Sequence, residues 1–367
     1  MGSANVHGER PNATIGDGMA TDHGDRRAYH RLYGLTLATT VPVGPLATTN
    51  RAADEAVDWT IGWVDPPADP RAAPPGRPIV TEGVWPAVRD GDVVTLWHED
   101  LGRVGIDLAS RRIALGLTVR TDEVAALLLR GIVLALALEL TGVPTLHANG
   151  VVIDGGAVAV AGPRGVGKTT VTAALCAAGL ELLSDDLVAI DAEGDRWCAR
   201  AGLTQLRLRG EAAHLAELIG DRYPQASSVD GRHVVVLPPA TNERSPLRAI
   251  VVPRVDDTVV RPQLVRITGA EAFRHVAVGF RIATFVDPPA LVSRLAVMAA
   301  LARSVPVLAL TMPLRHRWTA DDAIELRHVF DDTFSTSSGD GFDVAADVAV
   351  DVAVDVVGDA AADGPRR

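Results

Sequence analysis

Lysine, cysteine and long apolar segments are scarce in this sequence. It contains two cysteines, Cys176 and Cys198, which form no CxxC pair and no Cys/His cluster. That spacing matches no usual zinc-binding pattern and gives no basis for a disulfide framework. We therefore expect both cysteines to be small core residues of a reduced, cytoplasmic protein.

No apolar segment of the sequence is typical of a membrane span or a secretion signal. The longest apolar run covers residues 124–140, and Arg130, Gly131 and Glu139 interrupt it. Because it is too short and too charged to cross a bilayer, it predicts a buried helix. The N-terminus is polar, unlike a signal peptide. We expect a protein that does not bind membranes.

Excess positive charge is also missing. The formal net charge is −11, which gives no support for a nucleic-acid-binding surface. The 367 residues are 47% hydrophobic, enough to bury a sizeable core, and the length suggests about two domains.

Composition divides the chain into four regions. Residues 1–28 are polar and lack periodicity, so we expect disorder there. Residues 29–120 predict a β-rich N-terminal region, and residues 121–334 form the region that carries the motifs described below. Residues 335–367 repeat Asp with Val and Ala and predict an acidic low-complexity tail, with a weak amphipathic helix as the alternative.

Apolar runs and turn residues predict a mixed α/β (α+β) fold. Strands are predicted at residues 32–43, 56–64, 79–84, 93–98, 104–108, 113–119, 145–153, 157–161, 180–183, 187–190, 197–200, 204–209, 232–238, 248–252, 263–267 and 305–310. Helices are predicted at residues 122–141, 171–178, 210–219, 269–277 and 288–303. Turns at residues 109–111 and 154–156 would join two pairs of these strands as hairpins.

The strongest motif is a phosphate-binding loop, G-x-x-x-x-G-K-[ST], between a predicted strand and a predicted helix. Its glycines allow a tight turn whose N–H groups point at an anion, and the helix N-terminus adds a positive potential. We expect the nucleotide to be bound by Gly162, Pro163, Arg164, Gly165, Val166, Gly167, Lys168, Thr169 and Thr170. A glycine-rich turn that binds no nucleotide is the alternative.

Lys168 is the only lysine in the chain, and apart from histidine every other basic side chain is arginine. A compact ammonium on a flexible stem suits this loop, and a planar guanidinium is not equivalent. Lys168 is therefore expected to reach the β- and γ-phosphates, and the Thr169 hydroxyl to bind Mg²⁺.

Two acidic residues, Asp185 and Asp186, follow the loop helix beside a predicted strand. Such a pair can divide two tasks, holding the metal and accepting a proton from an attacking hydroxyl. A solvated turn after a strand is the alternative. His147, on the strand before the loop, would lie near the phosphates, although an isolated histidine on an apolar strand is more often a core residue.

Together, L-H-A-x-G-V at residues 146–151, the hairpin, the loop and the Asp pair resemble the catalytic domain of the HPr kinase/phosphorylase family. The resemblance covers about residues 145–210. It implies a P-loop domain with an ATP-binding fold similar to phosphoenolpyruvate carboxykinase, preceded by a β-rich region, with ATP and Mg²⁺ bound. It also implies that Asp185 is the base toward a serine hydroxyl, that Asp186 helps to hold the metal and that His147 lies by the phosphates.

The chain departs from the family at one position of its second signature. Residues 206–210 read L-R-L-R-G where the family reads roughly L-E-I-R-G, so Arg207 replaces a metal-associated Glu. Glu211 or Asp191 are candidate substitutes. The N-terminal region looks like that of divergent HPr kinase-related proteins, some of which resemble kinases for the C-terminal serine of lasso precursor peptides.

Three hypotheses remain open. The first is an ATP- and Mg²⁺-dependent kinase acting on a serine-type hydroxyl of a peptide or protein. The second is a kinase for a small-molecule hydroxyl on the same scaffold. The third is a nucleotide-binding regulator without transfer activity, which the Arg207 exchange favours. Family relatives are often oligomers, which leaves a homo-oligomer open.

Overall fold

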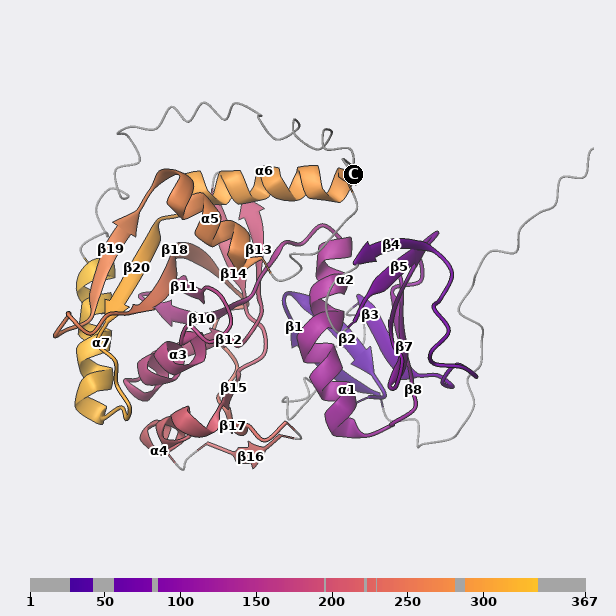
Figure 1. The fold of residues 1–367 in the computed structure, drawn as a ribbon, viewed down its shortest axis with the longest axis horizontal. Coiled ribbons are helices and arrows are strands. Elements are labelled where there is room, and N and C mark those ends of the chain that lie inside the picture. The colour runs from indigo at the N-terminus through magenta and orange to yellow at the C-terminus, as the bar shows by residue number, and fades with distance from the viewer. Residues whose placement is uncertain are drawn as a thin grey trace, which may run out of the picture.

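Two β-sheets lie side by side in the computed structural model, each with its own helices (Figure 1). The structure describes residues 27–41, 56–80, 85–194, 196–220, 223–228, 230–280 and 288–335. The predicted disordered N-terminus and acidic tail lie almost entirely outside these residues. Within the described residues, every helix is too short or too polar to cross a membrane.

The first sheet has eight strands in the order β1-β2-β3-β8-β7-β6-β5-β4. The strand content agrees with the β-rich N-terminal region expected from the sequence. Its strands are β1 (Ala28–Leu32), β2 (Leu35–Thr39), β3 (Trp59–Trp63), β4 (Arg77–Val80), β5 (Ala87–Asp90), β6 (Val93–His98), β7 (Gly102–Asp107) and β8 (Arg112–Leu117). The predicted β7–β8 hairpin is confirmed. The strand predicted at residues 32–43 is present as β2, and it begins at Leu35 because Tyr33 and Gly34 both adopt positive φ and form the turn of a hairpin with β1.

The helix predicted at residues 122–141 is present as α1 (Asp122–Leu128), a π-helical segment η1 (Leu129–Val133) and α2 (Leu134–Leu140). Gly131 lies inside the π-helical segment, where its low helix propensity makes an irregular turn less costly. Leu129 and Leu136 of this helix share a core with Leu96 and Leu115 of the eight-stranded sheet. The helix therefore packs on the sheet that precedes it.

The second sheet has nine strands, with β12-β10-β11-β18-β14-β13-β9 in one path, β20 beside β18 and β19 beside β20. They are β9 (Thr145–Leu146), β10 (Ala148–Ile153), β11 (Gly156–Ala161), β12 (Glu181–Ser184), β13 (Val188–Glu193), β14 (Arg196–Arg200), β18 (Arg244–Val255), β19 (Gln263–Ile267) and β20 (Val307–Met312). A small third sheet contains β15 (Gln205–Leu208), β17 (His233–Val236) and β16 (Gln225–Ser227) in that order.

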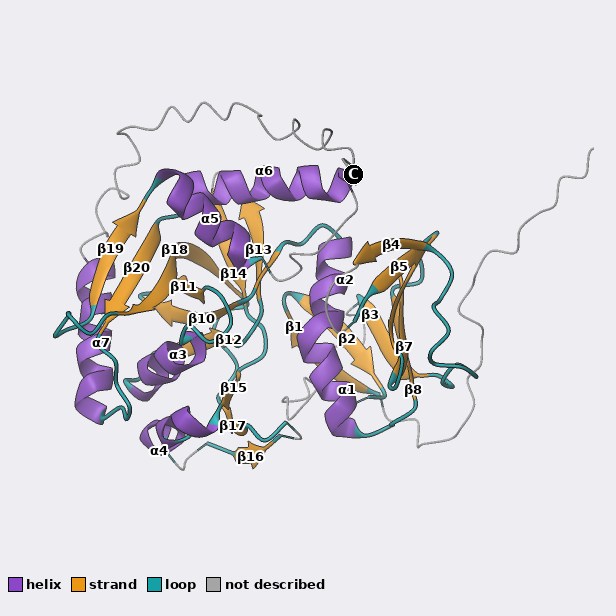
Figure 2. Cartoon of the chain, viewed as in Figure 1, coloured by secondary structure: helices purple, strands orange, loops and turns teal. Residues whose placement is uncertain are grey.

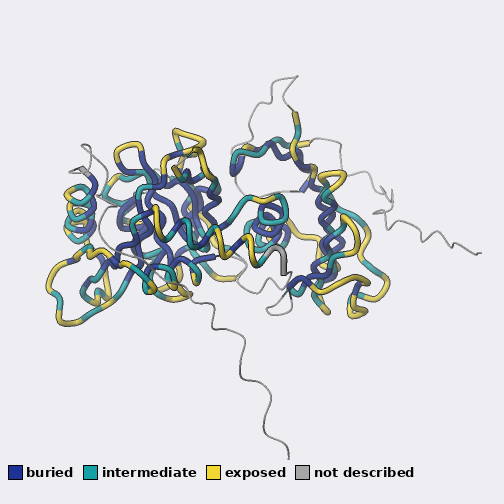
Figure 3. Tube along the Cα trace, turned by 90° about the horizontal axis from the view of Figure 1, so that it is seen from above, coloured by how far each residue is buried: buried dark blue, intermediate teal, exposed yellow. Residues whose placement is uncertain are grey.

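Helices cover both faces of the second sheet (Figure 2). These helices are α3 (Lys168–Ala177), the 3₁₀ turn η2 (Gly210–Ala212), α4 (His214–Ile219), α5 (Gly269–Gly279), α6 (Pro288–Ser304) and α7 (Ala320–Ser335). Strand β11 shows why the sheet has two buried faces. Val158 and Val160 pack in the core with α3, α4 and α7, and the intervening Ala157 and Ala159 pack toward α5 and α6. All of β11 is buried. Figure 3 shows the buried segments, in dark blue, mainly in the interior of the molecule.

The Tyr33–Gly34 turn connects the two halves of the molecule. The Tyr33 N–H donates to the Ala201 carbonyl at 2.7 Å, and the Arg200 guanidinium donates to the Tyr33 carbonyl at 3.0 Å. The Tyr33 side chain is fully buried. The N-terminal sheet thus inserts an aromatic ring next to the segment that follows β14.

Gly202 is required where that ring enters. A Cβ at this position would lie 2.7 Å from Cζ of Tyr33 and would also overlap the ring edge and the Ser184 hydroxyl. Gly202→Ala is therefore expected to lower the free energy of unfolding by about 1–3 kcal/mol, the usual cost of overpacking. Thermal melting measures it, with Gly210→Ala as the control, because nothing lies within 4 Å of a Cβ there. Equal melting temperatures for the two variants would contradict this packing.

Candidate functional site

Strand β10 brings the predicted site residues to one edge of the second sheet. Ala161, the last residue of β11, lies opposite Ala148 at the start of β10. Ser184, the last residue of β12, lies opposite Gly150 on the other side of β10. Because neighbouring strands are about 4.8 Å apart and the two strand ends are offset by two residues along β10, β11 and β12 end roughly 12 Å from each other. The glycine loop, His147 and the Asp pair therefore leave the sheet at the same edge.

The strand, loop and helix predicted around the motif are all present. Strand β11 ends at Ala161, helix α3 begins at Lys168, and Gly167 caps the helix. Gly162, Gly165 and Gly167 have φ angles of 135°, 88° and 98°, a region that side chains disfavour. Glycine therefore occupies positions where the loop backbone has a positive φ. The loop leads into the N-terminus of α3, a place suited to an anion.

Lys168 is buried, with 7% of its surface exposed. Its Nζ donates to the carbonyl oxygens of Gly162 at 2.8 Å and Pro163 at 3.2 Å. The ammonium therefore lies across the loop and not in solvent. Pro163 and Arg164 at the loop tip are exposed, which leaves the loop accessible to a ligand. These residues fit a nucleotide phosphate, since an ammonium, positive-φ glycines and a helix N-terminus meet at one place.

Asp185 is the buried member of the Asp pair. It is 7% exposed, its N–H donates to the Leu203 carbonyl at 2.7 Å, and its Oδ1 is buried without a hydrogen-bond partner. Burial and, next in size, the negative charge of Asp186 raise the pKa of Asp185 to about 7, against the opposing effect of Arg207. A carboxyl that changes protonation near neutral pH is suited to general-base chemistry.

Asp186 has a different environment. Its backbone adopts a left-handed conformation with φ of 63°, and its carboxylate is 41% exposed. The Asp186 N–H donates to Asn149 Oδ1 at 3.1 Å. His147 Nδ1 lies 3.2 Å from Asp186 Oδ1, so the structure joins these two predicted residues directly. The strand predicted at 145–153 is interrupted at His147, whose N–H donates to the Gly279 carbonyl at 2.6 Å instead.

The chemistry of the donors is compatible with Mg²⁺. Thr169 is partly buried near the start of α3 and Asp186 is partly exposed, and both offer hard oxygen ligands. Among the described residues, no three His, Cys, Asp or Glu side chains are grouped to hold a metal. Mg²⁺ commonly takes one or two protein oxygens and completes its shell with phosphate and water. The assignment of Thr169 and Asp186 stays a prediction.

Arg207 lies on β15, and its Nη2 donates to both carboxylate oxygens of Asp230 at 2.7 Å. Its guanidinium and its backbone N–H both lower the pKa of Asp185, so Arg207 is close to the predicted base. Asp191, one candidate substitute, is held by Arg200 at 2.9 Å and Arg244 at 2.8 Å. Both ion pairs use its Oδ2, whereas its Oδ1 is buried without a hydrogen-bond partner.

The sequence analysis did not identify Asn149 or Tyr33 as part of the site. Asn149 is the variable residue of L-H-A-x-G-V, and its position two residues after His147 was the available signal. Its amide Nδ2 is buried without a partner, in the strand between the loop and the Asp pair. Tyr33 gave no signal, because only the tertiary structure brings the first hairpin here.

Comparison with known proteins finds similarity to solved structures only. No family model matches the sequence, and no curated protein matches it. A solved structure of the HPr(Ser) kinase/phosphatase from Coxiella burnetii matches 53% of this chain and 99% of that chain, at 13% identity and a TM-score of 0.30. At such low values, activity has to be argued from the residues of this chain.

Proposed function

We propose that this protein is an ATP- and Mg²⁺-dependent kinase that transfers a phosphoryl group to a serine-type hydroxyl of a peptide or protein. The main support is the meeting of two features at one sheet edge. One is the glycine loop with its buried Lys168, and the other is the buried carboxyl of Asp185. The proposal places the protein in the cytoplasm, and its oligomeric state remains to be measured.

The loop would bind the triphosphate. Its N–H groups and the Lys168 ammonium are the donors for the phosphate oxygens, and charge-assisted hydrogen bonds of this kind are about twice as strong as neutral ones. Thr169 and Asp186 would hold Mg²⁺, which neutralises charge on the phosphates when bound. His147, at 3.2 Å from the Asp186 carboxylate, would keep that carboxylate in position.

Asp185 would act on the acceptor. Its carboxylate accepts the proton of the hydroxyl while the hydroxyl oxygen bonds to the γ-phosphorus, and ADP leaves with the electron pair of the broken P–O bond. The pKa of Asp185, about 7, leaves a substantial deprotonated fraction at neutral pH. Burial also excludes water from this carboxyl, which limits loss of the phosphoryl group to water.

The direct test is ATP turnover by the whole protein with pools of serine peptides and of small metabolites. We expect ADP release that requires a peptide acceptor and stops when EDTA removes Mg²⁺. Phosphorylation of a free amino acid or sugar without peptide would support a metabolite kinase. Tight ATP binding by calorimetry, with no ADP release over hours, would show a nucleotide-binding regulator. Turnover that is unchanged by EDTA would refute the metal assignment.

A further inference from the structure

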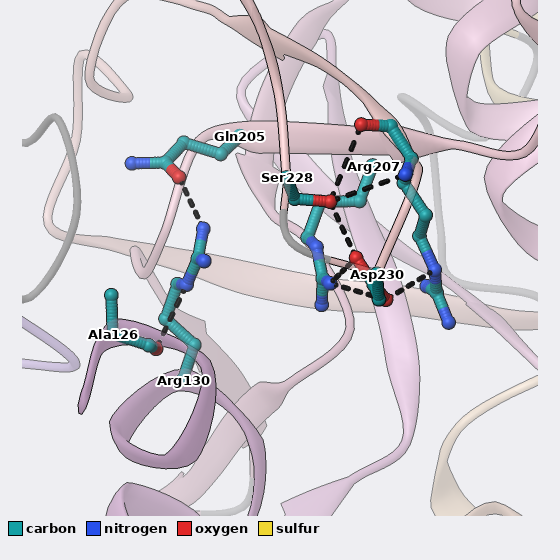
Figure 4. A network of polar contacts seen from close by, with 7 residues as sticks. Ala126, Arg130, Gln205, Arg207, Ser228 and Asp230 are labelled. Atoms are coloured by element: carbon teal, nitrogen blue, oxygen red, sulfur yellow. Dashed lines mark hydrogen bonds and ion pairs between the residues drawn. The ribbon is translucent and has the colours of Figure 1, made fainter. Parts of the chain in front are cut away.

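Three arginines from separate segments lie close enough to Asp185 to interact with its charge, and Figure 4 labels two of them, Arg130 and Arg207. Arg130 comes from the π-helical segment, and its guanidinium donates to Ala126 O at 3.0 Å and to Gln205 Oε1 at 2.6 Å. Arg207 comes from β15, and Arg232 precedes β17. We call Arg130, Arg207 and Arg232 the arginine cluster.

The members of the arginine cluster are close enough to repel one another. Burial lowers the pKa of Arg130, and the positive charge of Arg207 lowers it further. The same two causes, in the same order, lower the pKa of Arg232. A partly buried concentration of like charge is unfavourable unless an anion accompanies it.

One internal carboxylate accompanies two of the three arginines. Asp230 accepts from Arg207 Nη2 at 2.7 Å and lies 3.0 Å from Arg232 Nε. The Ser228 hydroxyl also donates to Asp230, as Figure 4 shows. Arg130 makes no ion pair with a described residue, because its two partners are a carbonyl and an amide oxygen. The cluster therefore carries more positive charge than Asp230 balances.

Unused donors lie in the same place. Gln205 is 2% exposed, and its Nε2 has no hydrogen-bond partner although its Oε1 binds Arg130. The Nε of Arg207 is likewise buried without a partner. Both residues lie on one face of β15, while Leu206 and Leu208 point into the core. A buried donor left unpaired is costly, so two of them indicate a missing acceptor.

The cluster adjoins the proposed base. The Arg207 backbone N–H bonds the Asp185 carboxylate, and the Arg207 guanidinium favours its charged form. An anion bound by the cluster would therefore lie close to a hydroxyl presented to Asp185.

We propose that the arginine cluster is an acceptor subsite for a carboxylate close to the phosphorylated hydroxyl. This inference rests on the proposed kinase function and specifies its substrate class. A carboxylate is favoured because the cluster already holds one, that of Asp230, and because the planar guanidinium matches carboxylate geometry. Asp230 occupies part of the subsite. The substrate carboxylate either displaces the Asp230 carboxylate or binds beside it, at Arg130.

The test measures peptide binding by calorimetry in the presence of Mg²⁺ and a non-hydrolysable ATP analogue. In one pair of short serine peptides, one peptide ends in a free C-terminal carboxylate and the other in an amide. In the second pair, the residue after the serine is Asp in one peptide and Asn in the other. We expect the carboxylate form of at least one pair to bind about 10-fold or more tightly, and the pair identifies the source of the carboxylate. Equal affinities within both pairs, or no binding of either carboxylate peptide, overturn the proposal.

Variants separate a subsite from a structural ion pair. Arg130→Gln and Arg232→Gln should each reduce the preference for the carboxylate, whereas Asp230→Asn should strengthen carboxylate binding by removing the internal competitor. Arg317→Gln is the control, since that side chain is 73% exposed and is distant in sequence from the arginine cluster. If an arginine variant does not fold, Asp230→Asn still decides. Weaker carboxylate binding by Asp230→Asn would contradict the proposal.

Phosphoryl transfer to the same peptides is measured in parallel, so the two proposals can fail separately. Carboxylate-selective binding without transfer would retain the subsite and refute the kinase. Transfer to carboxylate and amide peptides at equal rates, with equal affinities, would retain the kinase and refute the subsite.

Discussion

Asp185→Asn is expected to lower the rate of phosphoryl transfer by about 10²–10⁴-fold, the usual contribution of a general base. Asparagine keeps the shape of the side chain and an oxygen that can accept from the Arg207 N–H, but it cannot take a proton. ATP affinity should change little. Single-turnover transfer and calorimetric ATP titration measure the two effects, and equal transfer rates would remove Asp185 from the chemistry.

The same variant should be folded, and its stability tests the burial of the charge. The folded-state pKa of Asp185, about 7, lies above the ordinary value of 3.8, so the folded state favours the neutral form. The charged carboxyl therefore costs stability increasingly as pH rises from about 4 to above the folded pKa. In the nucleotide-free protein, Asp185→Asn should melt higher than wild type at about pH 8 and no higher at about pH 4. A variant that melts lower at both pH values would indicate a structural role for the carboxylate.

Lys168→Met is expected to weaken ATP binding by about 10–100-fold, because hydrogen bonds to charged groups contribute about 1.5–3 kcal/mol. Methionine retains an unbranched apolar stem for this buried position. Lys168→Arg should not restore binding, because a planar guanidinium does not fit between the carbonyls of Gly162 and Pro163 as the ammonium does.

The control for Lys168→Met is Arg261→Met, which removes one positive charge from a side chain that is 82% exposed. It should leave ATP affinity unchanged. Calorimetry at one ionic strength compares the three variants with wild type. If Lys168→Met binds ATP as wild type does, the loop does not bind phosphate through its lysine.

The elements predicted well have strong local signals. Strand β11 is an apolar run bounded by glycines, and the loop after it carries its own motif. Helix α7 was missed although its signal was present. Leu326, Phe330 and Phe334 repeat every four residues, and Thr319 and Asp322 form a reciprocal cap in which each side chain accepts from the other's N–H. An acidic surface on the helix obscured this pattern.

The loop lysine and the Asp pair could be predicted because their motifs are contiguous in sequence. The arginine cluster could not, since Arg130, Arg207 and Arg232 come from separate segments and each alone is an ordinary arginine in an arginine-rich chain. The exchange at Arg207 was visible, but its consequence depends on Asp230 and on the Asp185 carboxyl beside it.

The turn at Tyr33 makes the two halves of this protein mutually dependent. Burial, together with the charges of Asp186 and Asp185, raises the pKa of the Tyr33 phenol, which places a ring from the first sheet close to the Asp pair of the second. The N-terminal half therefore contributes a buried side chain to the surroundings of the proposed site. Truncation or exchange of that half would remove this side chain and change the environment of both carboxyls.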